Sequence, residues 1–421
     1  MNIHIPYGKA ELTLTLPQER VAAVLESKAH GYQAEASETE LVRRAMAAPV
    51  GTPRLQELAR GKKNIVIIVS DHTRPVPTQV IAPLLLAEIE AGNPQAQVTF
   101  LVATGLHRGT TEEELREKFG PDLYGKVRIV VHDCWDKSSL AQLAKLPSGG
   151  ELWLNKVAVE ADLLLAEGFI EPHLFAGFSG GRKSVLPGIV GDSTIRVNHC
   201  AEHIAHEKAR VGILEGNPIH EDMLHAARQA KLAYIVNVVI DAQKKVIGAF
   251  AGDVEQAHLQ GCAFLQELAA VAAAPAEIVV TTNGGYPLDQ NIYQHVKGLS
   301  SAEATCQKGG VIIVCTDLGD GHGSVELYEW LQKGAAAVTN TILAVDRYST
   351  VPDQWATQIM ARIQCKHKVI FVTAPAQHEV LRRMGFAAVE TFEEALAQAE
   401  EAVGREAKIT VIPDGVAVIV R

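Results

Sequence analysis

The sequence predicts an α/β fold, with two α/β domains whose mainly parallel sheets are flanked by helices. Short β-branched runs alternate with amphipathic segments along most of the 421 residues. Gly-rich or polar turns follow these runs, as expected where a strand leads into a helix. Because 47% of the residues are apolar and 21% are charged, the chain can bury one large core or several smaller ones. This composition excludes a disordered protein.

Eight apolar runs are expected to form strands, each continuous as in a sheet that is covered on both faces. They lie at residues 65–70, 98–103, 127–131, 162–166, 235–240, 278–282, 311–315 and 369–373. Residues 111–119 and 220–231 have the pattern of the intervening helices. Two last apolar runs bracket a Pro-Asp-Gly turn within residues 409–420 and could pair with either sheet.

Local signals mark helix starts and a linker. Thr111 with Glu114 and Thr391 with Glu394 have the spacing of capping boxes, and Asp253 is expected to open a helix. The Ala-rich stretch at 269–276 is the best linker candidate. It predicts a first domain at residues 1–270 and a second at 275–407, with 408–421 able to return to the first.

The charge balance argues against a nucleic-acid partner, because 39 Lys and Arg stand against 49 Asp and Glu, a net charge of −10. No apolar run approaches the roughly 18 residues of a membrane span, and the N-terminus lacks the pattern of a signal peptide. The six cysteines are scattered, without a Cys-x-x-Cys pair. We therefore expect a cytoplasmic protein with reduced thiols and no membrane partner.

Polar segments follow four of the predicted strands, at residues 71–75, 104–108, 167–173 and 283–286. Ligands of such sheets bind beyond the carboxyl ends of the strands, so Asp71, Arg74, His107 and His173 should share one edge. Arg74 could clamp a carboxylate or phosphate, or it could form a local pair with Asp71. His107 and His173 could be acid and base catalysts, although a structural role is commoner for any single histidine.

The Gly-rich segment at residues 177–184 looks like a phosphate loop. It is not a regular P-loop, because Arg182 separates Gly181 from Lys183. Successive glycine N–H groups could still converge on an anion. The alternative is a Gly-rich turn with a solvated lysine.

Two further groups of side chains have helical spacing. His199, His203 and His206 would share one face of a helix, which suggests a zinc site, but their order differs from His-Glu-x-x-His. Chance surface histidines fit equally well. Gln294 and Lys297 lie three residues apart at a predicted helix start and could face one ligand. A solvated helix face is the alternative there.

Taken together, the chain resembles the nickel-dependent lactate racemase family in eight segments that span both predicted domains. They are Ser-Asp-His-Thr-Arg-Pro at 70–75, Ala-Thr-Gly-Leu-His at 103–107, Glu-Gly-Phe-Ile-Glu-Pro-His at 167–173, Gly-Phe-Ser-Gly-Gly-Arg-Lys-Ser-Val-Leu-Pro-Gly at 177–188, Asn-His at 198–199, Asn-Gly-Gly-Tyr-Pro-Leu-Asp-Gln-Asn at 283–291, Tyr-Gln with Lys at 293, 294 and 297, and Pro-Asp-Gln-Trp at 352–355. Motifs of this length, in order, are far more specific than any single histidine.

The resemblance implies an isomerase that racemises lactate or a close 2-hydroxy acid by reversible hydride transfer through a pyruvate-like intermediate. It implies a covalently attached Ni(II)-pyridinium-3,5-bisthiocarboxylic acid mononucleotide, the nickel-pincer nucleotide, which other cofactor-biosynthesis proteins supply. The small-molecule 2-hydroxy acid would be the other partner.

The same resemblance implies that residues 1–270 bind the cofactor, that residues 275–407 contribute substrate-binding residues, and that the active site lies in the cleft between the two domains. It also assigns roles position by position. Lys183 would anchor the cofactor through a thioamide, His199 would ligate nickel, and His107 with His173 would be the catalytic pair. The cofactor seat would comprise Asp71, His72, Thr73, Arg74, Ser179, Gly180 and Gly181, and the substrate contacts Arg74, Tyr293, Gln294, Lys297 and Trp355. Cys200, His203 and His206 have no part in the family's pattern.

Other functions stay open at this point. A nicotinamide-dependent 2-hydroxy acid dehydrogenase would need a Gly-x-Gly-x-x-Gly turn after a strand, and the sequence has none. A non-catalytic phosphometabolite-binding protein could use residues 177–184, but it would leave His107, His173 and Lys297 without roles. A larger 2-hydroxy acid is the remaining alternative substrate, because Pro172 and Leu174 could shift the accepted size.

Overall fold

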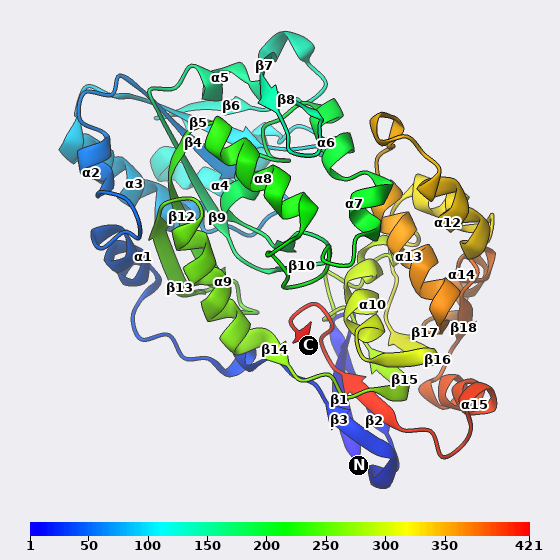
Figure 1. Ribbon diagram of the computed structural model, residues 1–421. Coiled ribbons are helices and arrows are strands. Elements are labelled where there is room, and N and C mark those ends of the chain that lie inside the picture. The colour runs from blue at the N-terminus through cyan, green and yellow to red at the C-terminus, as the bar shows by residue number, and fades with distance from the viewer.

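The computed structural model describes residues 1–421, apart from the side chain of residue 30. Two six-stranded sheets, each with helices on both faces, make up most of the molecule (Figure 1). We call each sheet with its packed elements the first and the second domain. All eight predicted strands are present, and the predicted α/β class is confirmed. None of the helices in the described part of the chain has the length and apolar character needed to cross a bilayer.

The first sheet has the order β13-β12-β9-β4-β5-β6. Its pairs are parallel except for β13, which runs antiparallel to β12. The strands are β4 (Asn64–Ser70), β5 (Gln97–Ala103), β6 (Arg128–Val131), β9 (Leu163–Phe169), β12 (Leu232–Ile240) and β13 (Val246–Gly252). Because β9, β4 and β5 are neighbours, the loops that follow them start side by side.

Helices cover both faces of the first sheet. Helices α1 (Glu38–Ala47), α3 (Thr78–Gly92) and α4 (Glu112–Leu123) pack on one face, and α8 (Pro218–Gln229) and α9 (Gln256–Ala269) on the other. The remaining elements of this domain are α2 (Leu55–Leu58), α5 (Lys156–Val159), α6 (Asp192–Asn198), α7 (Ala201–Ala205), the pair β7 (Leu140–Lys145) and β8 (Glu151–Asn155), and the pair β10 (Pro172–His173) and β11 (Gly177–Phe178).

The predicted helix starts are present. The side chain of Thr111 accepts the N–H of Glu114 at the start of α4, and Thr391 does the same for Glu394 at the start of α15 (Phe392–Val403). Asp253 accepts the backbone N–H groups of Glu255 and Gln256 just before α9. These signals could be found in the sequence because each involves residues within one turn.

The second sheet has the order β18-β17-β16-β15-β19-β3 and is parallel throughout. Its strands are β3 (Val21–Val24), β15 (Ala276–Thr281), β16 (Cys306–Cys315), β17 (Lys368–Val372), β18 (Ala387–Val389) and β19 (Ile409–Ile412). The hairpin of β1 (Asn2–Tyr7) and β2 (Ala10–Thr15) packs with α15 on one face. The other face carries α10 (Val296–Glu303), α11 (Val325–Leu331), α12 (Ala335–Leu343), α13 (Gln354–Lys366) and α14 (His378–Arg383).

Strand pairing departs from the predicted domains at both ends of the chain. The N-terminal strands β1, β2 and β3 belong with the second sheet, although chain order had placed them in the first domain. Strand β19 lies between β15 and β3 in the second sheet, while β20 (Ile419–Val420) pairs with β14 (Ala270–Val271) between the domains. No local sequence signal marks such pairing, because the paired strands come from opposite ends of the chain. The boundary near residue 270 stays a prediction.

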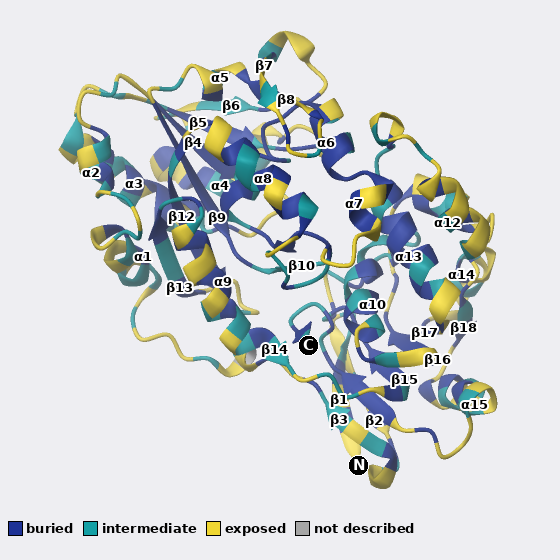
Figure 2. Ribbon diagram, in the orientation of Figure 1, coloured by how far each residue is buried: buried dark blue, intermediate teal, exposed yellow. Residues whose placement is uncertain are grey.

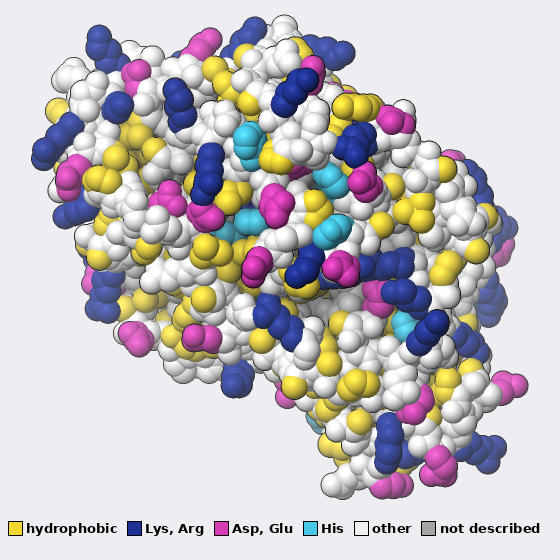
Figure 3. Space-filling view, viewed as in Figure 1, with side chains coloured by type: hydrophobic (Ala, Val, Ile, Leu, Met, Phe, Trp, Pro, Cys, Tyr) yellow, Lys and Arg dark blue, Asp and Glu magenta, His cyan; other side chains and the backbone are white. Residues whose placement is uncertain are grey.

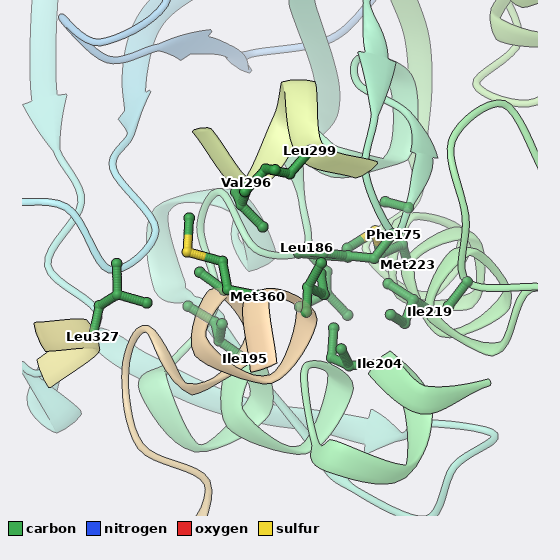
Figure 4. Packing of buried hydrophobic residues seen from close by; sticks show 14 of the residues in the cluster. Phe175, Leu186, Ile195, Ile204, Ile219, Met223, Val296, Leu299, Leu327 and Met360 are labelled. Carbon is green, nitrogen blue, oxygen red and sulfur yellow. The ribbon is translucent and has the colours of Figure 1, made fainter. Parts of the chain in front are cut away.

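One apolar cluster continues from the first domain into the second (Figure 4). Leu186, Ile195 and Ile204 come from the first domain, and Val296 and Met360 come from helices of the second. Helices α7 and α13 are largely buried where the domains meet (Figure 2). Because burial of one such side chain contributes roughly 1.5–3 kcal/mol, this cluster holds the domains against each other, so that both can contribute to a single site.

Candidate active site

A cavity of about 620 Å³ lies where the two domains meet. Its wall comes from the loops that follow β4, β5 and β9 in the first sheet and β15 and β16 in the second, together with the start of α13. The carboxyl ends of parallel strands share one edge, which explains this convergence. In the space-filling view, Lys, Arg, His and acidic side chains gather along the junction of the domains (Figure 3).

Thirteen of the predicted site residues line this cavity. They are Asp71, Thr73, Arg74, His107, His173, Ser179, Gly180, Lys183, His199, Tyr293, Gln294, Lys297 and Trp355. His72 and Gly181 are not part of the wall. The ring of His72 lies 3.2 Å from the Thr110 hydroxyl, and a Cβ on Gly181 would come within 2.8 Å of the His258 ring. Both residues therefore contact protein rather than the cavity.

The 177–184 segment does not offer its N–H groups to an anion in the way that the phosphate-loop hypothesis requires. The N–H of Gly181 donates to Asn237 Oδ1 at 2.6 Å, and the N–H of Lys183 donates to the carbonyl of Gly180 at 3.1 Å. These two donors are already used within the protein. The segment instead carries the Lys183 side chain to the cavity.

His107 is held by a buried carboxylate. Its Nδ1 lies 2.6 Å from Oδ2 of Asp71, which is 1% exposed, while the N–H and hydroxyl of Thr73 donate to Oδ1 of Asp71. Burial alone would raise the pKa of Asp71, but the hydrogen bond and charge of His107 together with Thr73 bring it below its ordinary value. The carboxylate therefore keeps a hydrogen on Nδ1 of His107 and leaves Nε2 able to accept a proton.

The side chain of Arg74 does not form the local pair with Asp71 that the sequence left open. Its Nη1 donates to the carbonyl and hydroxyl oxygens of Thr73, at 3.3 and 2.9 Å. Most of the guanidinium is thus available to a ligand in the cavity that it lines. A carboxylate fits its planar array of donors.

His173 has a different environment. Its Nδ1 accepts the backbone N–H groups of Ala176 at 3.2 Å and Phe175 at 3.5 Å, so the neutral ring carries its hydrogen on Nε2. Burial, followed by the positive charge of Lys183, holds the pKa of His173 well below its ordinary value. The ring is therefore neutral at neutral pH and can offer a hydrogen bond from Nε2.

Lys183 lies on η4 (Gly181–Ser184) next to a fully buried arginine. Arg182 is 0% exposed and donates to the carbonyls of Ala176 and Phe178, to His220 Nδ1 and to His258. Burial is the main cause that holds the pKa of Lys183 well below its ordinary value, and the positive charges of Arg182 and Arg74 add to it. The amine is thereby shifted toward its neutral, nucleophilic form.

The Arg182 network predicts a loss of stability in acid. Burial and the charge of Arg182 lower the pKa of His220 to about 3, so the unfolded chain binds a proton below its pKa of about 6.5 that the folded chain does not. The stabilisation is complete above pH 6.5 and falls as pH falls, by about 2 kcal/mol between pH 6.5 and 5. Urea unfolding at pH 7 and pH 5 measures it. In His220→Gln this part of the pH dependence should disappear, and an unchanged slope would contradict the assignment.

His199 lies in the break between α6 and α7 rather than on a helix. The prediction that His199, His203 and His206 share one helical face is therefore wrong: helix α6 ends at Asn198, whose carbonyl contacts Nδ1 of His203 at 3.0 Å. Among the described residues, no group of three or more His, Cys, Asp or Glu could hold a metal. This result removes the support for the zinc hypothesis.

The His199 ring is enclosed by aromatic side chains. Its centroid lies 5.0 Å from that of Phe175 and 5.1 Å from that of Trp355, both edge to face. Its Nδ1 is buried without a hydrogen-bond partner among the described residues. Burial and the charges of Lys183 and His203 hold the pKa of His199 well below its ordinary value, so the ring is neutral, the form that ligates metals.

A second cation joins Arg74 on the substrate side. Lys297, from α10, lines the main cavity and, with Arg74 and Glu171, a smaller neighbouring cavity of about 50 Å³. Burial lowers the pKa of Lys297, and Glu171 opposes that shift. Two cations that line the cavity beside two histidines are suited to a small acid that carries an oxygen on the adjacent carbon.

The comparisons with known proteins decide the family. The family model of the lactate racemase N-terminal domain matches residues 7–212, and that of the lactate racemase C-terminal domain matches residues 271–420. The chain belongs to the lactate racemase family. It is thus an enzyme, an isomerase that acts on a small molecule.

Relatives of known name agree along the whole length of this lactate racemase family member. It is 55% identical to a lactate racemase of Thermoanaerobacterium thermosaccharolyticum and 49% identical to one of Lactiplantibacillus plantarum, covering 100% of this chain and 99% of each relative. The solved lactate racemase apoprotein of T. thermosaccharolyticum superposes with a TM-score of 0.97 at 54% identity, covering 100% of both chains. A Thermotoga maritima protein, at 18% identity, 93% coverage of this chain, 100% of its own and a TM-score of 0.64, shares the fold alone.

Several cavity residues had no predicted role. Leu106, Pro187, Asn291, Gly323 and Asp353 all line the wall. Four of them lie in or beside segments that carried the family resemblance, so their position in those motifs was the available signal. Gly323 had no such signal, because it reaches the cavity only through the loop after β16.

Proposed function

We propose that this enzyme interconverts L- and D-lactate. The observation that carries the proposal is the cavity itself, where His107, His173, Lys183, His199 and Lys297 meet although they come from distant parts of the chain. The full-length identity to proteins named lactate racemase supports the same substrate. A dehydrogenase or a passive phosphometabolite-binding protein would not require this set of side chains.

The proposed cofactor is the nickel-pincer nucleotide, and the residues present fit it. The cavity volume of about 620 Å³ is within the roughly 300–1,000 Å³ usual for cofactor sites. Lys183 offers an amine at the cavity wall for covalent attachment, and His199 offers a buried nitrogen that has no partner among the described residues. Arg74, Thr73, Ser179 and the backbone at Gly180 would line the nucleotide. When bound, this group would supply a carbon that accepts and returns a hydride.

The protein's part in the reaction begins with proton removal. The α-hydrogen of lactate is very weakly acidic because the adjacent carboxylate is already anionic. If that hydrogen leaves with its electron pair while the hydroxyl proton goes to a histidine, the product is a 2-oxo acid rather than a dianion. His107 can take this proton at Nε2, and Asp71 stabilises the imidazolium that forms.

The second histidine and the two cations serve the return step. Arg74 and Lys297 hold the carboxylate, which keeps the 2-oxo acid in place while it presents its other face. In that second orientation the Nε2 hydrogen of His173 hydrogen-bonds to the carbonyl oxygen. As the hydride returns to C2, the proton that His107 took up passes back to this oxygen, so that no net proton is gained or lost. The two histidines therefore contact the substrate oxygen in its two orientations.

Chiral chromatography of L- and D-lactate tests the proposal directly. The chain is produced together with the cofactor-biosynthesis proteins and nickel, and loading is confirmed by intact mass. Each enantiomer should yield the racemate, and Lys183→Ala should not react. Loaded enzyme that leaves lactate unchanged would overturn the substrate assignment, and turnover of larger 2-hydroxy acids would then replace it.

Replacing Lys297 with alanine should weaken substrate retention more than chemistry. A charge-assisted hydrogen bond contributes roughly 1.5–3 kcal/mol, so KM for lactate should rise about 10- to 100-fold, and free pyruvate should appear during turnover. Initial rates and coupled detection of released pyruvate measure both effects. Lys333→Ala, at a lysine that stacks on Trp330 outside the cavity, is the control. An unchanged KM without pyruvate release would contradict this role.

A further inference from the structure

Asp353 combines two unusual features at the start of α13. It lines the cavity, and its φ of +61° places it in the left-handed region that side chains other than Gly rarely adopt. Of the four such non-glycine residues in the described part of the chain, Asp353 alone lines the cavity. Such a backbone costs about 1–2 kcal/mol, and it clusters at functional positions.

The Asp353 side chain ties two cavity loops together. The hydroxyl of Ser324 donates to Oδ2 of Asp353 at 2.8 Å, and the same hydroxyl accepts the N–H of Leu327 at the start of α11. Ser324 follows Gly323, which also lines the cavity. The carboxylate thus fixes the loop after β16 against the segment that carries Trp355.

Tyr293 lines the same cavity as Asp353 and Trp355. Burial raises the pKa of Tyr293, the carboxylate of Asp353 raises it further, and a contact with the Trp355 side chain lowers it. These directions place the Tyr293 phenol close to the Asp353 carboxylate and to the Trp355 side chain. Because all three residues line the cavity, their contact holds the two rings at its wall.

We propose that Asp353 is a positioning residue that locks the Tyr293 and Trp355 rings into an apolar wall, and that this wall limits the size of the substituent on the substrate's C2 carbon. The inference rests on the proposed function. With the carboxylate at Arg74 and Lys297 and the oxygen at the histidines, the third substituent, a methyl group in lactate, is left to meet apolar surface. A fixed aromatic wall discriminates against an added methylene, whereas a mobile one yields to it.

Substrate preference in Asp353 variants tests the proposal. Glycine accepts the left-handed backbone without strain but has no carboxylate, so Asp353→Gly separates the two features. In that variant the ratio of kcat/KM for lactate to that for 2-hydroxybutyrate should fall at least about tenfold, the scale of one methylene. Asp353→Asn, which keeps an acceptor for Ser324, should fall in between. A wild-type ratio in Asp353→Gly would show that the aspartate serves only the backbone, and would overturn the proposal.

A spectroscopic test needs no turnover. Fluorine NMR of cofactor-free protein labelled with 5-fluorotryptophan reports on Trp135, Trp153, Trp330 and Trp355, the last assigned by its loss in Trp355→Phe. Asp353→Gly and Tyr293→Phe should each shift the Trp355 resonance and leave the other three tryptophan resonances unchanged. Because both substitutions act on one contact, the double variant should show about the same Trp355 shift as Tyr293→Phe.

The control is Asp346→Ala, which removes the carboxylate that caps the nearby turn through the N–H of Tyr348. It should leave the Trp355 resonance in place. A Trp355 resonance unmoved in Asp353→Gly, or moved equally by Asp346→Ala, would overturn the positioning role. If loaded wild-type enzyme racemises neither acid, the proposed function and the size selection fail, while the spectra still decide whether Asp353 positions Trp355.

Discussion

Lys183→Ala is expected to abolish covalent loading of the cofactor and, with it, all measurable racemisation. The amine is enclosed within the cavity wall, and its pKa is lowered by burial and by Arg182 and Arg74, so it is the nucleophile available there. Intact mass spectrometry of protein produced with the cofactor-biosynthesis proteins should show the adduct on wild type and the bare chain in Lys183→Ala.

The matched control is Lys297→Ala, which removes the other lysine that lines the cavity. Its adduct should form in full, because its role is assigned to the substrate. The fold should tolerate both changes, because each lysine lines the cavity, where a shorter side chain leaves no void within a packed core. A full adduct mass on Lys183→Ala, or its loss from Lys297→Ala alone, would reject the anchor assignment.

The features that could be predicted from the sequence are those set by neighbouring residues. The strands of the first sheet are continuous apolar runs, and the capping box at Thr111 lies within one turn. Because parallel strands share a carboxyl edge, the residues that follow β4, β5 and β9 were expected to meet. Asp71, His107 and His173 do meet there.

The features that could not be predicted depend on contacts between distant residues. Asp71 had a plausible partner three residues away in Arg74, but the pairing of β4 with β5 brings His107 to its carboxylate instead. The helical spacing of His199 and His203 gave no sign of the break at Cys200, where the backbone is extended. The left-handed backbone of Asp353 likewise could not be predicted, because Asp adopts this region more readily than most residues but only in a minority of positions.

The largest loss of turnover in correctly loaded enzyme is expected at the Asp71–His107 pair. His107→Ala removes the group that accepts the hydroxyl proton, and a positioned acid–base residue contributes about 10²- to 10⁴-fold. The kcat for lactate should fall by that factor, whereas KM should change little because Arg74 and Lys297 still hold the carboxylate. His173→Ala should also cost orders of magnitude.

Asp71→Asn shows whether the carboxylate acts through His107. An amide keeps the shape of Asp71 but neither stabilises the imidazolium nor fixes its hydrogen on Nδ1, so kcat should again fall by about 10²- to 10⁴-fold. Initial rates in both directions, on protein with a confirmed adduct, measure the loss, and His225→Ala on α8, outside the cavity, is the control. If the two residues form one unit, Asp71→Asn combined with His107→Ala should be no slower than His107→Ala alone. If kcat of the double variant falls further, by the product of the two single effects, Asp71 has a separate role such as binding the cofactor. Near-normal turnover in Asp71→Asn would show that His107 acts without its buried carboxylate partner.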